Sequence, residues 1–234
     1  KATDTDLTPD AIFGSGNANG NFEINTSSGV EVGIRPKIPF NGLTNRNGDG
    51  TYSYSISETD HDNNGGTANR WNFDWAINVD SEGSSGAKLD DFTYELGLDG
   101  DPGQGTDYLV FDPITPTLET PWYDHSIGDN TTLNGQGEEA PQFDYITYRN
   151  LLETKNVLQQ SWRYSFFPAG ALATYDPDIP GIYTVYLKVL DSNGVTVSRA
   201  EAQVLIGGAL PAPEDDSVCS TIPNQNGGYS IICL

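Results

Sequence analysis

The chain has 234 residues, enough for one large domain or two small ones, and its hydrophobic content of 36% is too high for a disordered chain. The formal net charge of −22 disfavours nucleic acid and anionic membranes as partners and favours cations, although acidity also keeps exported proteins soluble. Of the acidic residues, 22 are Asp and 11 are Glu. This excess of Asp, together with 26 Gly and 14 Pro, predicts short strands joined by many turns.

Several features are typical of a mature exported protein, found outside the cell or on its surface. The chain begins at Lys1 and contains no Met. No apolar run reaches the length of a membrane span. The two cysteines, Cys219 and Cys233, are predicted to form one disulfide that closes a small C-terminal loop. A metal site is the less favoured alternative, because two thiolates without a nearby His provide too few ligands.

Residues 1–20 form a polar segment, which needs its own domain or a neighbouring molecule to lie on if it is ordered. Strand patterns follow at short spacing. The first three run from Phe22 to Asn25, from Val30 to Ile38, and from Tyr52 to Ile56. Pro36 and Pro39 indicate that the second of these is an edge strand or ends early.

The clearest strand runs from Arg70 to Val79. Its alternate residues Trp71, Phe73, Trp75, Ile77 and Val79 are apolar, whereas those between them are mostly polar. Period-two alternation predicts one face in the core and one in water. The segments from Phe92 to Leu98 and from Tyr108 to Phe111 continue the series of strands.

Residues 112–142 are rich in proline and glycine and are expected to form a long surface excursion. A helix is predicted from Asp144 to about Gln160, with Asp144 as its N-cap. A strand is expected next, from Ser161 to Phe167.

The last regular element of the main domain is a β-hairpin from Gly181 to Ile206, because Asn193-Gly194 lies in a tight turn between alternating segments. We therefore expect three parts: an N-terminal polar segment (1–20), a β-sandwich domain (21–207), and a linker with a disulfide-closed tail (208–234). The predicted fold is an all-β, immunoglobulin-like or jelly-roll-like antiparallel sandwich with one inserted helix.

Two resemblances accompany this pattern. The hairpin phrase Gly181-Ile-Tyr-Thr-Val-Tyr-Leu-Lys-Val-Leu-Asp-Ser-Asn-Gly194 resembles the closing strands of PKD-type and related immunoglobulin-like domains. A wider stretch, about 12–207, resembles exported bacterial proteins of the PEP-CTERM type. The matching phrases are Gly16-Asn-Ala-Asn-Gly20, Trp71-Asn-Phe-Asp-Trp75 and Ser161-Trp-Arg-Tyr-Ser-Phe-Phe-Pro168. The Val-Pro-Glu-Pro signal, the apolar anchor and the final Arg cluster of that family are not in this sequence, so the resemblance implies only an exported, β-rich protein.

Two loops match the beginning of a calcium-binding loop, in which oxygen ligands at positions one, three and five precede a Gly at position six. One contains Asn45, Asn47 and Asp49, and the other contains Asp60, Asp62 and Asn64. Calcium is therefore the predicted cofactor. Since Ile56 and Trp71 occupy the twelfth positions in place of Glu, ordinary Asx turns are the alternative. The loop at Asp99-Gly-Asp101 is a weaker third match.

Catalytic motifs are poor, and we expect no enzyme. The two histidines, His61 and His125, are accompanied by no nucleophile elbow, phosphate loop or zinc signature. Trp122 and Tyr123 lie outside a strand pattern and are the predicted sugar-binding platform, whereas Trp71, Trp75 and Trp162 are expected in the core.

Two functions fit these observations. The first is a secreted structural protein: a self-assembling subunit of an extracellular filament, sheath or surface layer, built by strand donation from residues 11–13 or 217–234 and assisted by cations. The second is a monomeric carbohydrate-binding or adhesin module. The expected partners are other copies of the chain or an extracellular polysaccharide.

Overall fold

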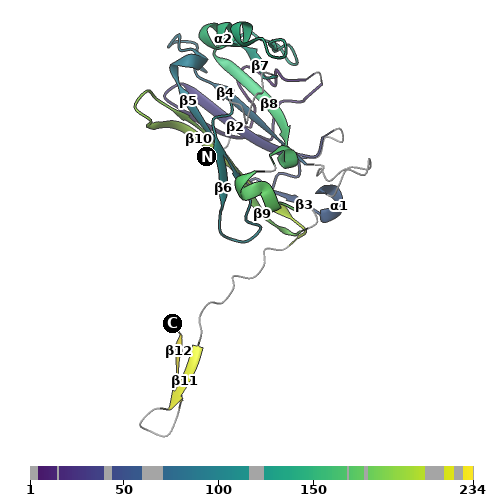
Figure 1. Ribbon diagram of the computed structural model, residues 1–234, viewed down its shortest axis with the longest axis vertical. Helices are drawn as coiled ribbons and strands as arrows, with labels where there is room; N and C mark the ends of the chain where they lie inside the picture. The colour runs from purple at the N-terminus through teal and green to yellow at the C-terminus, as the bar shows by residue number, and fades with distance from the viewer. Residues whose placement is uncertain are drawn as a thin grey trace.

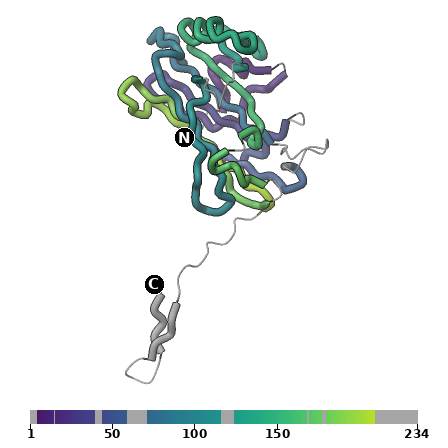
Figure 2. Tube along the Cα trace, in the orientation of Figure 1, coloured from purple at the N-terminus to yellow at the C-terminus, as the bar shows by residue number. Residues whose placement is uncertain are grey.

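The structure is a computed structural model. It describes residues 5–14, 16–39, 44–59, 71–115, 124–167, 169–176, 179–208, 219–223 and 229–233 (Figures 1 and 2). Two five-stranded sheets contain most of these residues. The strand order is β1-β2-β4-β8-β7 in the first sheet and β3-β10-β9-β5-β6 in the second. Neighbouring strands are antiparallel except β3 and β10, which are parallel. The fold is an all-β sandwich, as predicted.

The strands of the first sheet are β1 (Glu23–Ser27), β2 (Val30–Lys37), β4 (Asn72–Asn78), β8 (Val157–Arg163) and β7 (Ser126–Gly128). Those of the second sheet are β3 (Thr51–Tyr54), β10 (Thr196–Ile206), β9 (Gly181–Leu190), β5 (Thr93–Asp99) and β6 (Tyr108–Phe111). The helices are α1 (Ile56–Thr59), α2 (Tyr145–Thr154) and the 3-10 turns η1 (Leu89–Asp91), η2 (Tyr164–Phe166) and η3 (Gly170–Thr174).

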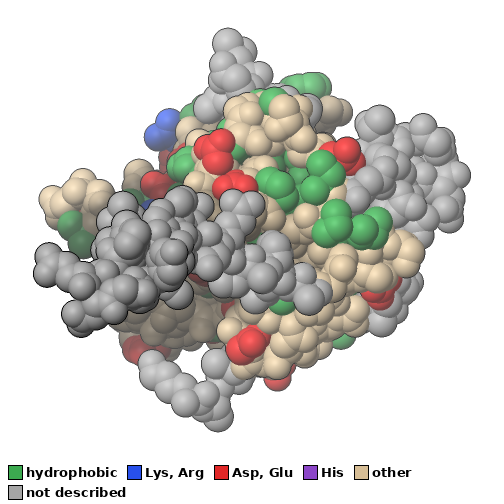
Figure 3. Space-filling view, turned by 90° about the horizontal axis from the view of Figure 1, so that it is seen from below, with side chains coloured by type: hydrophobic (Ala, Val, Ile, Leu, Met, Phe, Trp, Pro, Cys, Tyr) green, Lys and Arg blue, Asp and Glu red, His purple; other side chains and the backbone are tan. Residues whose placement is uncertain are grey.

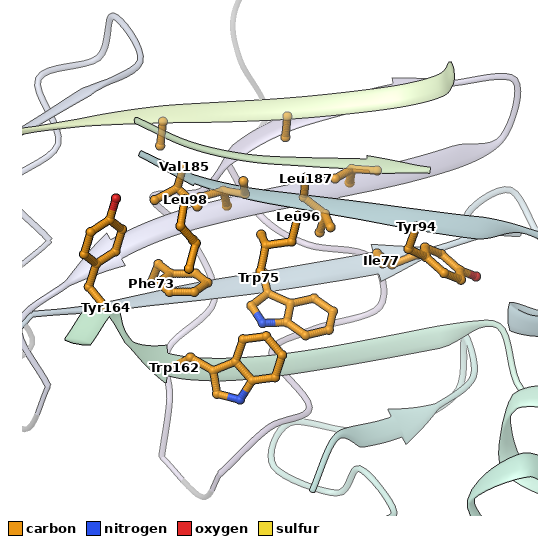
Figure 4. Close-up of a cluster of buried hydrophobic side chains, with 14 of the residues drawn as sticks. Phe73, Trp75, Ile77, Tyr94, Leu96, Leu98, Trp162, Tyr164, Val185 and Leu187 are labelled. Atoms are coloured by element: carbon orange, nitrogen blue, oxygen red, sulfur yellow. The ribbon is translucent and has the colours of Figure 1, made fainter. Parts of the chain in front are cut away.

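The core lies between the two sheets and is centred on β4. Phe73, Trp75 and Ile77 of β4 are buried and lie in one cluster with Leu96 and Leu98 of β5 and Val185 and Leu187 of β9 (Figure 4). Trp75 packs against Trp162 of β8 with ring centroids 5.1 Å apart, and Trp71 stacks on Tyr164 at 4.2 Å. Each large side chain buried in this way stabilises the fold by about 1.5–3 kcal/mol. The three tryptophans that the alternation predicts in the core are confirmed there.

The predicted hairpin of Gly181 to Ile206 is confirmed as β9 and β10, which pair along almost their whole length. Asp191 accepts hydrogen bonds from the N–H groups of Asn193 and Val195 and so holds the turn. Gly194 has a φ of +76°, the left-handed conformation that glycine tolerates.

The predicted helix is correct at its beginning and wrong at its end. Asp144 caps α2 by accepting a hydrogen bond from the N–H of Thr147. The helix stops at Thr154, because Val157 and Leu158 join β8 and pair with Asn78 and Ile77 of β4. The excursion predicted for 112–142 is also partly wrong. It contributes the short strand β7, and Ile114 and His125 are buried within it.

The N-terminal polar segment is part of the sandwich. Residues 5–14 and 16–22, called here the N-terminal strap, lie against the outer face of the first sheet. There Leu7, Ala11, Phe13 and Phe22 surround Ala76 in a small second core. The polar face of β4, predicted to be in water, is therefore buried: Asp74, Ala76 and Asn78 are 0–4% exposed. The boundary expected at residue 20 does not separate the strap from the sandwich.

The C-terminal residues form a third, separate sheet of two strands, β11 (Cys219–Pro223) and β12 (Tyr229–Cys233), which pair antiparallel with each other. Among the described residues, no helix combines the length and hydropathy needed to cross a membrane.

Candidate functional site

The predicted calcium loop at residues 45–50 has its side chains occupied in holding its own turn. Asn45 donates to the carbonyl of Ser53 and to Glu58, and Asn47 donates to the hydroxyls of Thr51 and Ser53. Asp49 accepts from the N–H and the hydroxyl of Thr51, which lowers its pKa. These bonds fit the alternative interpretation, an Asx-type turn. Calcium binding at this loop stays a prediction.

Several predicted site residues lie outside the described residues. They are Asp60, Asp62 and Asn64 of the second calcium loop, His61, and the proposed sugar platform Trp122 and Tyr123.

The weaker acidic loop contains one buried carboxylate. Asp99 is 1% exposed, and its Oδ1 accepts from the N–H groups of Asp101 and Asp107, which closes the loop between β5 and β6. Burial raises the pKa of Asp99. Among the described residues, no group of three His, Cys, Asp or Glu side chains is arranged to hold a metal ion. The two hydrogen bonds that Asp99 accepts from the backbone give this buried carboxylate a structural role, which is to hold the loop closed.

The register of the C-terminal hairpin places Cys219 directly opposite Cys233. Opposite residues in an antiparallel pair have Cα atoms about 4.5–5.5 Å apart, within the range that a disulfide spans. The disulfide stays a prediction, and its geometry is compatible with this backbone.

His125 lies in an aromatic environment inside the sandwich. It is 0% exposed, and its ring lies 5.5 Å from Trp75, 5.6 Å from Trp162 and 5.7 Å from Tyr148, measured between centroids. The Tyr148 hydroxyl donates to the carbonyl of Ile114 and contacts His125 Nδ1 at 3.1 Å. Burial lowers the pKa of His125 to about 3, so the ring is neutral at physiological pH. A buried, uncharged imidazole of this kind has no access to a substrate.

The most developed candidate site is a groove of about 680 Å³ on the outer face of the first sheet. Its floor comes from β2, β4 and β8, one end comes from β7 and the residues near Glu139, and one wall is the N-terminal strap. The described residues that line it are Phe13, Gly14, Gly16, Asn17, Ala18, Asn19, Asn21, Arg35, Lys37, Ile38, Pro39, Thr44, Asn72, Ser126, Glu139, Gln160 and Ser161.

A buried ionic cluster lies under this groove and fixes the strap to the sheet. Asp74 is fully buried and pairs through Oδ2 with Arg35 at 2.7 Å and through Oδ1 with Lys37 at 2.8 Å. Arg35 Nη1 also donates to the carbonyls of Ala18 and Gly20 in the strap. The two cations stack on strap aromatics, Arg35 over Phe22 at 4.1 Å and Lys37 over Phe13 at 5.1 Å. The same side chains therefore hold the wall and line the site.

The uncharged side chains of the groove form a loosely bonded polar surface. Asn72 donates to the Ser161 hydroxyl at 3.2 Å, and its own Oδ1 has no partner within the described chain. The Ser126 hydroxyl contacts Glu139 at 3.5 Å, near the limit of a hydrogen bond. Gln160 donates to the carbonyl of Asp124. Of these groups, the half-buried Gln160 and Ser161 retain capacity for further hydrogen bonds with a ligand, whereas Asn72 Oδ1 is itself buried.

This groove is not evident from the sequence. The available signal was charge within strands: Arg35, Lys37 and Asp74 lie inside segments that alternate with buried apolar residues. Charged side chains at such positions are rarely buried unless they are paired. Which cations pair with Asp74 depends on the strand order of the sheet, and that order is not visible in the local pattern.

A second hollow, of about 740 Å³, lies between β3, α1 and the end of β10. Figure 3 shows this end of the sandwich, where hydrophobic side chains lie among acidic ones. The lining residues that the structure describes include no charged side chain; they are Ser53, Tyr54, Ser55, Ile56, Leu205, Gly207 and Gly208. The groove on the first sheet has charged side chains as well as amides and hydroxyls in its lining, so it can recognise a ligand more specifically than this hollow can.

Comparison with models of known protein families finds no match, and neither does comparison with curated proteins.

Proposed function

We propose that this protein is an extracellular binding module of the carbohydrate-binding or adhesin kind, and that the groove on the first sheet is its binding site. One observation carries the proposal: the groove of about 680 Å³ collects polar side chains from four strands and the strap on one rigid face. Ligand sites in proteins are typically clefts of roughly 300–1,000 Å³ with a few convergent polar groups.

The position of the groove supports this proposal. Its floor is formed by β2, β4 and β8, the three central strands of the sheet, whose backbones are paired on both sides. Side chains on such strands are held more firmly than side chains on loops, which favours a preorganised site. The wall formed by the strap is fixed by Arg35 and Lys37.

Self-assembly, the first hypothesis from the sequence, has less support. Ala11, Ile12 and Phe13, proposed there as a donor segment, are 0–3% exposed because they pack on their own sheet. The C-terminal strands pair with each other. Static light scattering of the purified chain separates the two functions. The binding module predicts a monodisperse particle of 25.3 kDa, and concentration-dependent growth of the particle would favour assembly.

Nuclear magnetic resonance tests the binding function directly. The labelled protein is titrated with a panel of neutral and acidic oligosaccharides, short peptides and nucleosides. A ligand of the groove should shift the backbone amide signals of Lys37, Asn72 and Ser161 and leave that of Gln203, on the second sheet, unchanged. If no compound of any class shifts the groove amides, the proposed function is wrong.

A further inference from the structure

The positive and negative charges of the side chains along the groove nearly balance. Arg35 and Lys37 both pair with Asp74, and the exposed carboxylate of Glu139 supplies a second negative charge. Among the described residues of the groove, two cations and two carboxylates leave the site close to neutral within a chain of formal charge −22. An anionic ligand would find both cations already paired and would approach against the field of the whole protein. A cationic ligand would find one unburied carboxylate among the lining residues that the structure describes, that of Glu139.

The remaining lining groups suit hydroxyls. A hydroxyl donates one hydrogen bond and accepts two, so it satisfies amides and other hydroxyls equally well. Gln160 offers an amide and Ser161 a hydroxyl, and both side chains are half-buried. Ser126 adds a hydroxyl that is largely buried, and Asn72 is half-buried with its Oδ1 buried beneath the groove. Four apolar residues line the same groove: Phe13, Ala18, Ile38 and Pro39. Ala18 and Pro39 are the more exposed of them and provide contacts for the C–H groups of a sugar ring.

The location of the groove disfavours an extended peptide. Peptides that bind sheets usually add a strand at an open edge, where backbone N–H and C=O groups are free. Under the groove, the backbone groups of β4 pair with β2 on one side and with β8 on the other. Recognition must therefore come from side chains, which is how proteins recognise sugar hydroxyls.

We infer that the groove binds a neutral, hydroxyl-rich saccharide built of hexose units, with Ser161, Gln160 and Glu139 among the groups that contact its hydroxyls. This ligand class depends on the binding function proposed above. Free oligosaccharides present the same neutral hexose hydroxyls as the ends or branches of a neutral polysaccharide, so either could be the source of this ligand.

Isothermal titration calorimetry tests the ligand class. The probes are neutral tetrasaccharides of glucose, mannose and galactose, and tetragalacturonate as the acidic counterpart. At least one neutral probe should bind, and because its binding involves no net charge, its affinity should change less than about twofold between about 0.05 and 0.5 M NaCl. Pull-down on an insoluble neutral polysaccharide shows whether the polymer is bound as well as the free oligosaccharide.

Two variants with matched controls locate the site. Ser161→Leu removes a hydroxyl and fills part of the groove, and should weaken binding about tenfold or more, whereas Gln203→Leu, a substitution on β10 outside the groove, should not. Glu139→Ala removes an exposed carboxylate with little risk to folding and should weaken binding about three- to tenfold. Its control is Glu153→Ala on α2, which is also exposed and lies outside the groove.

Preferential binding of tetragalacturonate, with an affinity that falls as salt rises, would overturn the neutral ligand class and leave the binding function intact. The same holds if no saccharide binds but a peptide or nucleoside shifts the groove amides. Saccharide binding that is unaffected by both groove variants would overturn the assignment of the site. If the whole panel leaves the groove amides unshifted, the ligand class and the proposed function fail together.

Discussion

Replacing Asp74 by Asn should destabilise the protein severely, because both Arg35 and Lys37 pair with the Asp74 carboxylate. The carboxylate is fully buried, and the side chains of Arg35 and Lys37 are 5% and 12% exposed. The substitution keeps the shape of the side chain and removes its charge, so two poorly solvated cations are left facing an amide. Breaking one buried ion pair costs about 3–5 kcal/mol. Since two pairs are lost here, we expect the upper part of this range.

Urea denaturation followed by tryptophan fluorescence measures the effect, because Trp71, Trp75 and Trp162 are all buried and report on the core. A loss of about 3–5 kcal/mol corresponds to a decrease in melting temperature of roughly 6–20 °C for a domain of this size. Asp90→Asn is the matched control. Asp90 is exposed, so its substitution should change the free energy of unfolding by less than about 0.5 kcal/mol.

A triple variant, Asp74→Leu with Arg35→Met and Lys37→Met, separates charge from packing. If the penalty comes from unpaired buried charge, the triple variant should be more stable than Asp74→Asn. It should not recover fully, because Arg35 also donates to the carbonyls of Ala18 and Gly20. A loss below about 1 kcal/mol for Asp74→Asn would show that the cations reach water, as in a surface pair, and would refute the buried cluster.

Three further outcomes follow from other parts of the structure. Burial lowers the pKa of His125 to about 3, below its unfolded value near 6.5, so protonation favours the unfolded state. Stability should fall by up to about 5 kcal/mol as the pH drops from about 6.5 to 3, and His125→Phe should remove this part of the acid sensitivity in denaturation curves measured across pH. A Cβ at Gly97 would lie 2.1 Å from the ring of Tyr186, so Gly97→Ala should cost about 1–3 kcal/mol in urea denaturation, and Tyr186→Ser in the same chain should relieve part of that cost. Peptide mapping without reductant should find Cys219 linked to Cys233, and reduction should remove about 3 kcal/mol of loop-closure stabilisation from the hairpin; two free thiols in the untreated protein would contradict the pairing.

The parts of the fold that could be predicted from the sequence depend on local patterns. Alternation from Arg70 to Val79 identifies the core face of β4, because side chains on a strand alternate between its two faces whatever the partners are. Asn193-Gly194 marks the turn of the last hairpin for an equally local reason, since its conformation needs residues that tolerate positive φ.

The opposite face of β4 could not be predicted in the same way. Its polar residues are typical of a solvated face, yet Asp74 and Asn78 are buried because the strap covers them. The contacts that decide this join distant residues: Arg35 to Asp74, and Asn78 to the carbonyl of Thr8. The strap carries few apolar residues and resembles a disordered tail by composition. Its ordering depends on side chains of the sheet, among them Gln159, which bonds the backbone of Asp10 and Ile12.

Dependence on contacts between distant residues also explains why the groove and the end of α2 could not be predicted from the sequence. The groove exists only where the strap, β2, β4 and β8 meet, so no single segment contains its pattern. The helical pattern continues to Gln160, but Val157 and Leu158 are buried more effectively as the strand beside β4. Tertiary pairing therefore overrides the local helical preference at that point.

The way the strap is attached sets a limit on how far the chain can be shortened. A recombinant version that started at Glu23 would keep every strand of the sandwich, yet it would strip the cover from Ala76 and Asp74. It would also remove the bonds that Gln159 and Asn78 make to the backbone of the strap. Such a fragment would expose an apolar and ionic patch on the middle of a sheet, which favours aggregation. Any expression boundary on the N-terminal side therefore belongs before Thr5, whose carbonyl accepts from the N–H of Phe22, although the first regular strand begins eighteen residues later.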